Sequence, residues 1–415
     1  MAFGPARMVR GIYAAYAWFA LFLALALLGA WLTGRVLTDR LHWSQYLHWM
    51  PGVVVTPACV VLALLGGMGA RRGSSRILRR SDRDSERPIR QRPALRRRVA
   101  RTLLFASLGA MAYVLVVELR IDRVVLARRG EHGDLRVLVW NLAYKKEAPI
   151  ASVIERERPD VVLLANPVWK YDYTALPGLM GTADAGAELL VAGEFCVASV
   201  RPVLAYGTTS LGLLGRRWTG DPMDYIEAEN PAEPLDRGRA MFVVLGEPGE
   251  ASNVEKVDAS SATGLPHGLV VWIIDMPSDP MLGRMDSARE AARMIASFDG
   301  SVYLREARAE GATRWIAREG DALGVHGFPE PSLVVGDFNV PRGADSLDVL
   351  THGLASAFAR GGRGYVATWP AEFPLLHLDQ AFAGRGLETL AYRTVFAEVV
   401  PHRAQVIDLR IVPHE

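Results

Sequence analysis

A few polar side chains stand directly beside short hydrophobic runs, where a buried strand would begin or end. Asn141 follows RVLVW, Asp337 and Asn339 lie in the tetrapeptide GDFN after SLVV, Asp379 precedes QAFA, and His402 precedes the last hydrophobic run. Strand ends present side chains from a rigid scaffold to a cleft. A carboxylate beside a histidine can move protons, and amides can hydrogen-bond substrate oxygens, so the set predicts acid-base chemistry.

Each of these residues also has a structural explanation when it is taken alone. An Asn after a strand is commonly a turn residue, and a lone His is commonly a core or surface residue. The order of the five residues and the sequence around each of them favour one shared site.

The elements that must position these residues are expected in one large domain, 134–415, which is strand-rich with helices between the strands. Its opening reads as strand, helix and strand at 136–140, 150–158 and 160–164. Further strands are expected at 189–200, 240–245, 269–274, 332–335, 380–383, 394–399 and 405–411. Further helices are expected at 287–298, 305–318 and 346–352, with loops at 207–238 and 247–267.

The region before this domain, 1–120, is expected to be a membrane anchor. Three runs without a charged side chain, 11–34, 49–70 and 102–117, predict three transmembrane helices. The third is short, and arginines at its ends could reach the headgroups. The alternative for each run is a buried core helix. A cleavable signal is excluded, because the first run is too long and no small-residue cleavage site follows it.

The arginines predict the orientation of this anchor. The stretch 71–101 carries thirteen Arg and three acidic residues, a net charge of +10. Because cytoplasmic loops collect Lys and Arg, this loop and the N-terminus are expected in the cytoplasm. The C-terminal domain would then lie outside the cytoplasm, attached to the cell (inner) membrane. Nucleic-acid binding is a weaker interpretation of this stretch than topology and contact with anionic lipid.

Outside the basic stretch the chain is mildly acidic and poor in cysteine. The remaining residues include 34 basic and 42 acidic side chains, a net charge of −8. Cys59 lies in the second hydrophobic run and Cys196 in the soluble domain, so no disulfide is expected within that domain.

The sequence around the five polar residues resembles the endonuclease/exonuclease/phosphatase superfamily, metal-dependent phosphoesterases that include deoxyribonucleases, sphingomyelinases and inositol-polyphosphate phosphatases. The resemblance covers the soluble domain and rests on LRVLVWN, RERPDVVLLAN, GDFNVPRGADSLDVL, the TWP at 368–370, LHLDQAF and PHRAQVIDLRI. It implies an α/β fold: a four-layer sandwich of two packed, mostly antiparallel sheets flanked by helices.

The resemblance also implies roles for individual residues. Asp379 and His402 match the family's Asp–His pair, in which the carboxylate orients the imidazole and raises its basicity. Asp337 and Asn339 match the residues that position the nucleophile and hydrogen-bond phosphoryl oxygens. Asn141 matches an Asn near the metal and the substrate. By analogy, Trp369 and the loop 207–238 are expected on the substrate side.

The match departs from the family at the residues that would hold Mg or Mn. The implied metal positions are Asn141, Asn166 and Asp337, but Asn166 stands where the family has Glu. Pro401 stands where an Asp would precede the last His. Because these ions prefer anionic oxygen ligands, metal affinity is expected to fall. Asp275, at the position of a phosphate-contacting His, could return one carboxylate or could cap the turn MPSD.

Two functions from different classes follow. The first is a membrane-anchored extracytoplasmic phosphoesterase that hydrolyses a phosphodiester or phosphomonoester. The second is a catalytically degenerate domain that acts as a binding or sensing module. A third interpretation makes the basic stretch functional and the domain a docking surface for a partner. Tethering to the lipid bilayer favours lipid headgroups, cell-envelope phosphoesters or extracellular nucleic acid as substrates, and no obligate protein partner is expected.

Overall fold

The structure is a computed structural model, which describes residues 5–68, 87–126, 133–146, 148–168, 172–180, 187–213, 215–216, 235–247, 265–307, 313–351 and 353–412. The chain divides into two compact units. One comprises Met1–Thr38 and Trp43–Asp122, and the other comprises Asp39–His42 and Arg123–Glu415.

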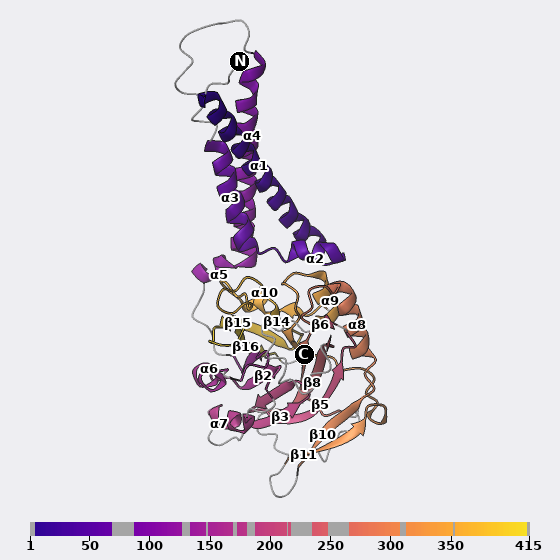
Figure 1. The fold of residues 1–415 in the computed structure, drawn as a ribbon. Helices are drawn as coiled ribbons and strands as arrows, with labels where there is room; N and C mark the ends of the chain where they lie inside the picture. Colours follow the sequence, from indigo (N-terminus) through magenta and orange to yellow (C-terminus); the bar gives the residue numbers. More distant parts are fainter. Residues whose placement is uncertain are drawn as a thin grey trace. The chain divides into compact units, whose positions relative to one another are not determined.

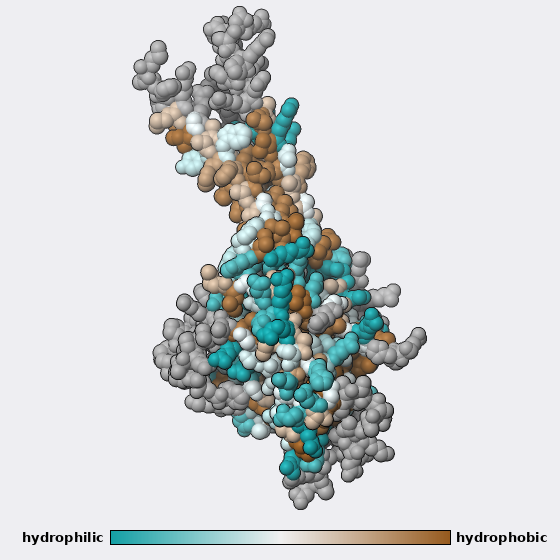
Figure 2. Space-filling model, turned by 90° about the vertical axis from the view of Figure 1, so that its right-hand side faces the viewer, coloured by the Kyte–Doolittle hydropathy of each residue, from teal (hydrophilic) through white to brown (hydrophobic). Residues whose placement is uncertain are grey.

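The N-terminal unit is a bundle of apolar helices. These are α1 (Pro5–Leu37), α2 (His42–His48), α3 (Gly52–Met68) and α4 (Arg87–Tyr113), which continues into a π-helical turn at Val114–Glu118; the short α5 (Ile121–Leu126) follows. Figure 2 shows hydrophobic side chains over much of the exposed surface of these helices. On their inner sides, Leu28, Trp31, Val55, Cys59 and Ala110 pack together.

Two of the helices are long and apolar enough to cross a membrane, at Gly11–Leu37 and Ala94–Glu118. The pair α2 and α3, bent by 72°, counts as a third if it is one broken span. Two or three apolar helices are therefore present where three were predicted. Residues 71–86 of the basic stretch lie outside the described residues. The prediction of a loop up to residue 101 was wrong, because α4 already begins at Arg87.

The second unit contains two mixed sheets (Figure 1). Parallel pairing joins β1 to β2 and β9 to β12, and the other strand pairs in the described part of the chain are antiparallel. In order, the six-stranded sheet consists of β15 (Leu387–Val395), β16 (Ala404–Ile411), β1 (Leu135–Asn141), β2 (Val161–Ala165), β4 (Phe195–Ser199) and β3 (Glu188–Ala192). The eight-stranded sheet consists of β11 (Thr313–Glu319), β10 (Ser301–Ala307), β5 (Val203–Ser210), β8 (Arg239–Leu245), β9 (Leu269–Asp275), β12 (Leu333–Asp337), β14 (Asp379–Ala383) and β13 (Ala355–Ser356). The short β6 (Gly215–Arg216) and β7 (Leu235–Asp236) form a ribbon.

The two sheets pack face to face, and helices cover their outer faces. Between the sheets, alternate residues such as Val139 of β1 and Val335 of β12 share one core. The intervening residues, such as Trp140 and Val334, pack outward against helices. Helices α6 (Ile150–Glu157) and α7 (Leu176–Leu179) lie on the six-stranded sheet, and α8 (Arg284–Ala296) and α9 (Asp345–Thr351) on the eight-stranded sheet. The helix α10 (Ala357–Gly361) packs at the inter-sheet core, and short 3-10 turns lie at Tyr173–Ala175 and Asp321–Leu323.

This arrangement confirms the expected α/β sandwich and explains the sequence pattern. Strands with both faces covered read as continuous hydrophobic runs, because every side chain is buried. Burial of one Val or Leu stabilises the fold by about 1.5–3 kcal/mol, so the central strands hold the scaffold rigidly beneath their polar ends.

Three predicted elements were wrong. The single strand expected at 189–200 is a hairpin of β3 and β4, which turns at Gly193 and Glu194. Residues 305–318, expected to be a helix, belong to the hairpin of β10 and β11. Ring contacts with the neighbouring strand β5 favour the hairpin over a helix. The ring centroid of Tyr206 lies 4.7 Å from that of Tyr303 and 4.9 Å from that of Trp315. The strand expected at 394–399 runs instead over Leu387–Val395, in register with β16. The expected loops 207–238 and 247–267 lie mostly outside the described residues.

Candidate active site

The register of the eight-stranded sheet brings three carboxylates together at one end of the sandwich. Asp275 ends β9, Asp337 ends β12 and Asp379 begins β14. Asp337 lies directly opposite both Asp275 and Asp379 in the strand pairing. Residues opposite each other point to the same face of a sheet. By strand alternation, this is the face of Val335 and Ile273, which looks toward the other sheet.

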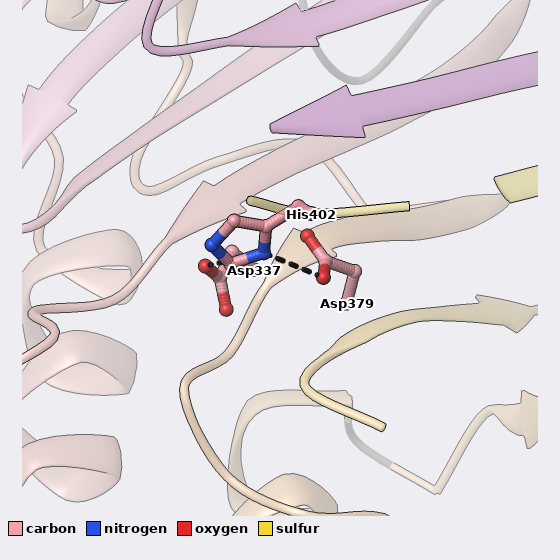
Figure 3. A group of neighbouring side chains, drawn as sticks. All are labelled: Asp337, Asp379 and His402. Carbon is pink, nitrogen blue, oxygen red and sulfur yellow. Dashed lines mark hydrogen bonds and ion pairs between the residues drawn. The ribbon is translucent and has the colours of Figure 1, made fainter. Parts of the chain in front are cut away.

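His402 completes this group from the turn before β16 (Figure 3). Its Nδ1 lies 2.9 Å from Oδ2 of Asp379 and 3.7 Å from Oδ2 of Asp337. Trp140 Nε1 donates a hydrogen bond of 2.9 Å to the carbonyl oxygen of His402. The backbone N–H of Asp379 donates to Oγ1 of Thr368 at 3.1 Å. The backbone of His402 is therefore held by β1, and the backbone of Asp379 by the loop that carries Thr368.

Asp337 is held by amides from both sheets. Its Oδ1 accepts the backbone N–H of Asn339 at 2.9 Å, and its Oδ2 accepts Nδ2 of Asn141 at 2.8 Å. The side chain of Asn339 turns instead to the carbonyl oxygen of Met276, at 2.7 Å. Asn141 ends β1, so its bond to Asp337 joins the six-stranded sheet to the eight-stranded sheet across the site.

Steric constraints explain why the first residue of GDFN is glycine. Gly336 has φ +140°, and a Cβ at this position would lie 1.8 Å from the carbonyl oxygen of Ile274. Only glycine allows β9 and β12 to approach this closely where Asp337 is presented. Asn339 has φ +50°, a left-handed conformation that Asn adopts more readily than most residues.

Burial and mutual charge shift the pKa values of this group. Burial, then the neighbouring Asp379 carboxylate, raises the pKa of Asp337 to about 6. Burial disfavours the imidazolium of His402, but the carboxylates of Asp379 and Asp337 outweigh it and raise its pKa to about 9. At neutral pH, His402 is therefore protonated and suited to donate a proton.

Asp337, Asp379 and His402 could hold a metal ion, because one ligand atom from each lies within 4.8 Å of the others. The amide of Asn166 donates through Nδ2 to Oδ1 of Asn141 at 3.0 Å. This leaves Oδ1 of Asn166 buried and without a hydrogen-bond donor in the described part of the chain. A cation would satisfy that oxygen, so the residues fit a metal ion. The shell is less anionic than one with Glu at this position, and divalent cations prefer anionic oxygen ligands.

The predicted site residues are brought together to different degrees. Asn141, Asn166, Asp337, Asp379 and His402 form one hydrogen-bonded and charge-coupled group. Asp275 is buried beside it but is not one of the three clustered metal-ligand candidates.

Trp369 is half-buried in the loop next to Thr368, and its backbone N–H bonds to Leu376 at 3.0 Å. Nothing in these contacts assigns it to a substrate.

Several supporting residues were missed from the sequence. Thr368 entered the sequence analysis only as part of TWP, although its hydroxyl oxygen accepts the backbone N–H of Asp379. Tyr392 donates to Oε1 of Gln405 at 2.6 Å and lies 2.8 Å from Nε2 of His377, behind the Asp–His pair. A Tyr, a Gln and a His spread over 29 residues carry no local signal, because strand pairing alone brings them together.

Comparison with known families agrees with this geometry. A profile of the Endonuclease/Exonuclease/phosphatase family matches residues 138–401, more than half of the chain. The chain therefore belongs to the endonuclease/exonuclease/phosphatase family. No curated protein matches it.

Similar solved structures share low sequence identity with the chain. An endonuclease/exonuclease/phosphatase family protein from Bacteroides thetaiotaomicron has 12% identity, covers 69% of this chain and 100% of its own, and gives a TM-score of 0.40. One from Beutenbergia cavernae has 18% identity, with coverages of 67% and 71% and a TM-score of 0.35. ANGEL2, described as a 2′,3′-cyclic phosphatase, has 11% identity, with coverages of 68% and 97% and a TM-score of 0.38.

Proposed function

We propose that the domain is a phosphoesterase that hydrolyses a phosphodiester or phosphomonoester by metal-assisted general acid-base catalysis. The observation that carries this proposal is the buried group of Asp337, Asp379 and His402, bridged to the other sheet by Asn141. Family membership supports the reaction class. Four polar side chains that converge at the end of an otherwise apolar core need a function other than stability.

In the proposed reaction, His402 acts as the acid and Asp337 as the base. Asp379 holds Nδ1 of His402, and Nε2 gives its proton to the leaving oxygen. The ionised carboxylate of Asp337 takes a proton from the attacking water. The new bond joins the water oxygen to phosphorus, and the bond from phosphorus to the leaving oxygen breaks. A proton transfer through solvent then restores both groups.

Asp379 and His402 serve the proton transfer in this proposal, so of the three clustered residues only Asp337 would remain for a metal ion. The ion, Mg or Mn, would be held by Asp337 together with the amide oxygens of Asn166 and Asn141. When bound, it would neutralise charge on the phosphoryl oxygens. Asn141 already uses Oδ1 to accept the N–H of Ala143 at 2.9 Å, so its amide would have to reorient to bind metal. Half-saturation is therefore expected at millimolar rather than micromolar metal, which titration calorimetry can measure.

We place the domain outside the cytoplasm, attached to the inner membrane by three spans. The two or three apolar helices and the arginines of 71–101 support this placement. In that compartment, phosphate groups on lipid headgroups, cell-envelope phosphoesters or extracellular nucleic acid are the available substrates.

The test is hydrolysis by the full-length protein in detergent micelles. Bis(p-nitrophenyl) phosphate and p-nitrophenyl phosphate distinguish diesterase from monoesterase activity, with Mg, with Mn and with EDTA. The His402→Ala and Asp337→Ala variants should lose turnover, and His326→Ala, at an exposed histidine, should keep it. Equal turnover in wild type and His402→Ala would refute the proposal that the domain is a phosphoesterase.

One observation favours a second candidate, a binding module without turnover. Neutral residues, Asn166 and Pro401, occupy two positions where acidic ligands were expected. A module of this kind would bind phosphate and show no hydrolysis with any metal tested.

A further inference from the structure

A basic side chain extends the row of three carboxylates on the same face of the sheet. Arg239 begins β8 and lies directly opposite Asp275 in the strand pairing. By alternation it shares the inner face with Met241 and Val243 of its own strand, which lie in the inter-sheet core. Across adjacent strands the row therefore reads Arg239, Asp275, Asp337, Asp379.

The position of Arg239 is fixed by the glycine before it. Gly238 has φ +62°, and a Cβ there would lie 2.8 Å from Cδ of Pro277 and 3.1 Å from the carbonyl oxygen of Asp275. Glycine thus permits the chain to enter β8 tightly against the end of β9. Neighbouring strands are about 4.8 Å apart, so the Arg239 backbone is roughly 10 Å from Asp337, a distance that a side chain of this length can largely span.

The ion pair made by Arg239 connects it to the other side of the site. Nε of Arg239 lies 3.2 Å from Oε2 of Glu194, in the hairpin between β3 and β4. The carbonyl oxygen of Glu194 accepts the backbone N–H of Asn166 at 2.9 Å. Glu194 therefore links the guanidinium of Arg239 to the backbone at Asn166, the position at which the carboxylate expected for a metal is replaced by an amide.

Stability alone does not account for this arginine. The Arg239 side chain is 44% exposed, and exposed pairs contribute about 0–1 kcal/mol. The ion pair with Glu194 uses Nε, and the terminal amino groups of a guanidinium carry further N–H donors in a planar fork. Such a fork matches two oxygens of a phosphate. Beside three carboxylates, a guanidinium would add to the charge of the protonated His402 and offset the repulsion of an anionic substrate.

We propose that the Arg239 guanidinium is a phosphate-binding subsite, which positions a phosphate anion beside Asp337 with or without a bound metal ion. Glu194 holds the guanidinium in place and competes with the anion for it. The inference rests on the proposed function for the role of the phosphate in turnover, but phosphate binding itself can be measured without turnover. Arg239 acts here as a substrate-binding residue, and the proton transfers remain with His402 and Asp337.

The experiment is titration calorimetry of inorganic phosphate into the full-length protein in micelles at pH 7.5, in excess EDTA. Arg239→Gln should weaken phosphate binding at least about tenfold, because it removes the fork and its charge. Arg239→Lys, which keeps the charge, should recover part of the affinity. Glu194→Gln should keep or tighten binding. The matched control is Arg289→Gln, which removes an exposed arginine paired with Asp286 on α8 and should change nothing.

The signs of these effects separate the proposal from a purely structural ion pair. If the ion pair only holds the two sheets together, Arg239→Gln and Glu194→Gln should both lower the melting temperature and should affect phosphate binding alike. That result would overturn the subsite. Wild-type protein that binds no phosphate in EDTA would overturn it as well. Arg239-dependent binding without hydrolysis would preserve the subsite and refute the hydrolase. Hydrolysis with an unchanged KM in Arg239→Gln would preserve the hydrolase and refute the subsite.

Discussion

At the scale of single residues, the Asp–His group determines how the reaction should depend on pH. The pKa of Asp337 is raised to about 6 and that of His402 to about 9. A carboxylate base works above its pKa and an imidazolium acid works below its pKa. In the proposed mechanism, kcat/KM with a phosphodiester should therefore fall through about pH 9. It should rise at or below about pH 6, because a metal ion on Asp337 favours the ionised carboxylate.

The Asp379→Asn variant tests this assignment. Removing the carboxylate that raises the pKa of His402 should move the alkaline limb to lower pH and reduce kcat by roughly 10²–10⁴-fold. His326→Ala serves as the control and should keep the wild-type profile. A rate that increases through pH 9 would instead make His402 the base.

Asp337 should also lower stability at neutral pH, in the absence of metal. Its folded pKa of about 6 lies above the ordinary value of 3.8. The raised pKa gives stability that is fully present below the unfolded pKa and is lost as pH rises through about 6. Two pKa units correspond to at most about 3 kcal/mol. In EDTA, Asp337→Asn should therefore melt at a higher temperature than wild type at pH 8, although it is inactive, and this advantage should disappear near pH 4.

The residues that could be predicted from sequence are those with a local signal. GDFN and the residues flanking hydrophobic runs identified Asp337, Asp379 and Asn141 before any contact was visible. Arg239 could not be found in this way, because its partner Glu194 lies 45 residues earlier and in the other sheet. Its position opposite Asp275 follows from strand register, which one sequence does not define.

At the scale of elements, the close approach of β9 and β12 is the least tolerant part of the scaffold. A Cβ at Gly336 would meet the Ile274 carbonyl oxygen, which is backbone and cannot rotate away. Gly336→Ala should therefore cost about 3 kcal/mol or more and abolish activity. Gly343 has φ +84°, and apart from its chain neighbours no atom of the described residues lies within 4 Å of its Cβ position. Gly343→Ala should cost about 1 kcal/mol and keep activity. Thermal melts of both variants test the difference, and equal losses would contradict the steric explanation.

The element that sequence reasoning missed also has a physical explanation. Residues 305–318 contain Arg, Glu and Ala, which favour helices, yet they contribute to a hairpin. The ion pair between Arg305 and Glu188 and the ring contacts of Trp315 are tertiary interactions. Such contacts with other strands override weak local propensity.

At the scale of the whole molecule, composition alone separated the apolar helices from the soluble domain. A long run without charged residues is a strong signal for a helix that could cross a membrane, because recognising it needs no information about tertiary contacts. The break between α2 and α3 was not foreseen, although Pro51 lies there and Pro57 lies within α3. Whether this pair spans the membrane decides the side on which the domain lies, since two crossings and three crossings give opposite answers.

Cysteine labelling can determine that side. Cys196 is fully buried, and burial raises the pKa of its thiol to about 12, so it should not react in the folded protein. Met281 is 68% exposed on the soluble domain, and Met281→Cys provides a reactive reporter. With three spans, a membrane-impermeant maleimide should label this variant in intact cells. The control, Ser74→Cys in the basic stretch, should be labelled only after lysis. The opposite pattern would place the domain in the cytoplasm and would restrict the substrates to cytoplasmic phosphoesters.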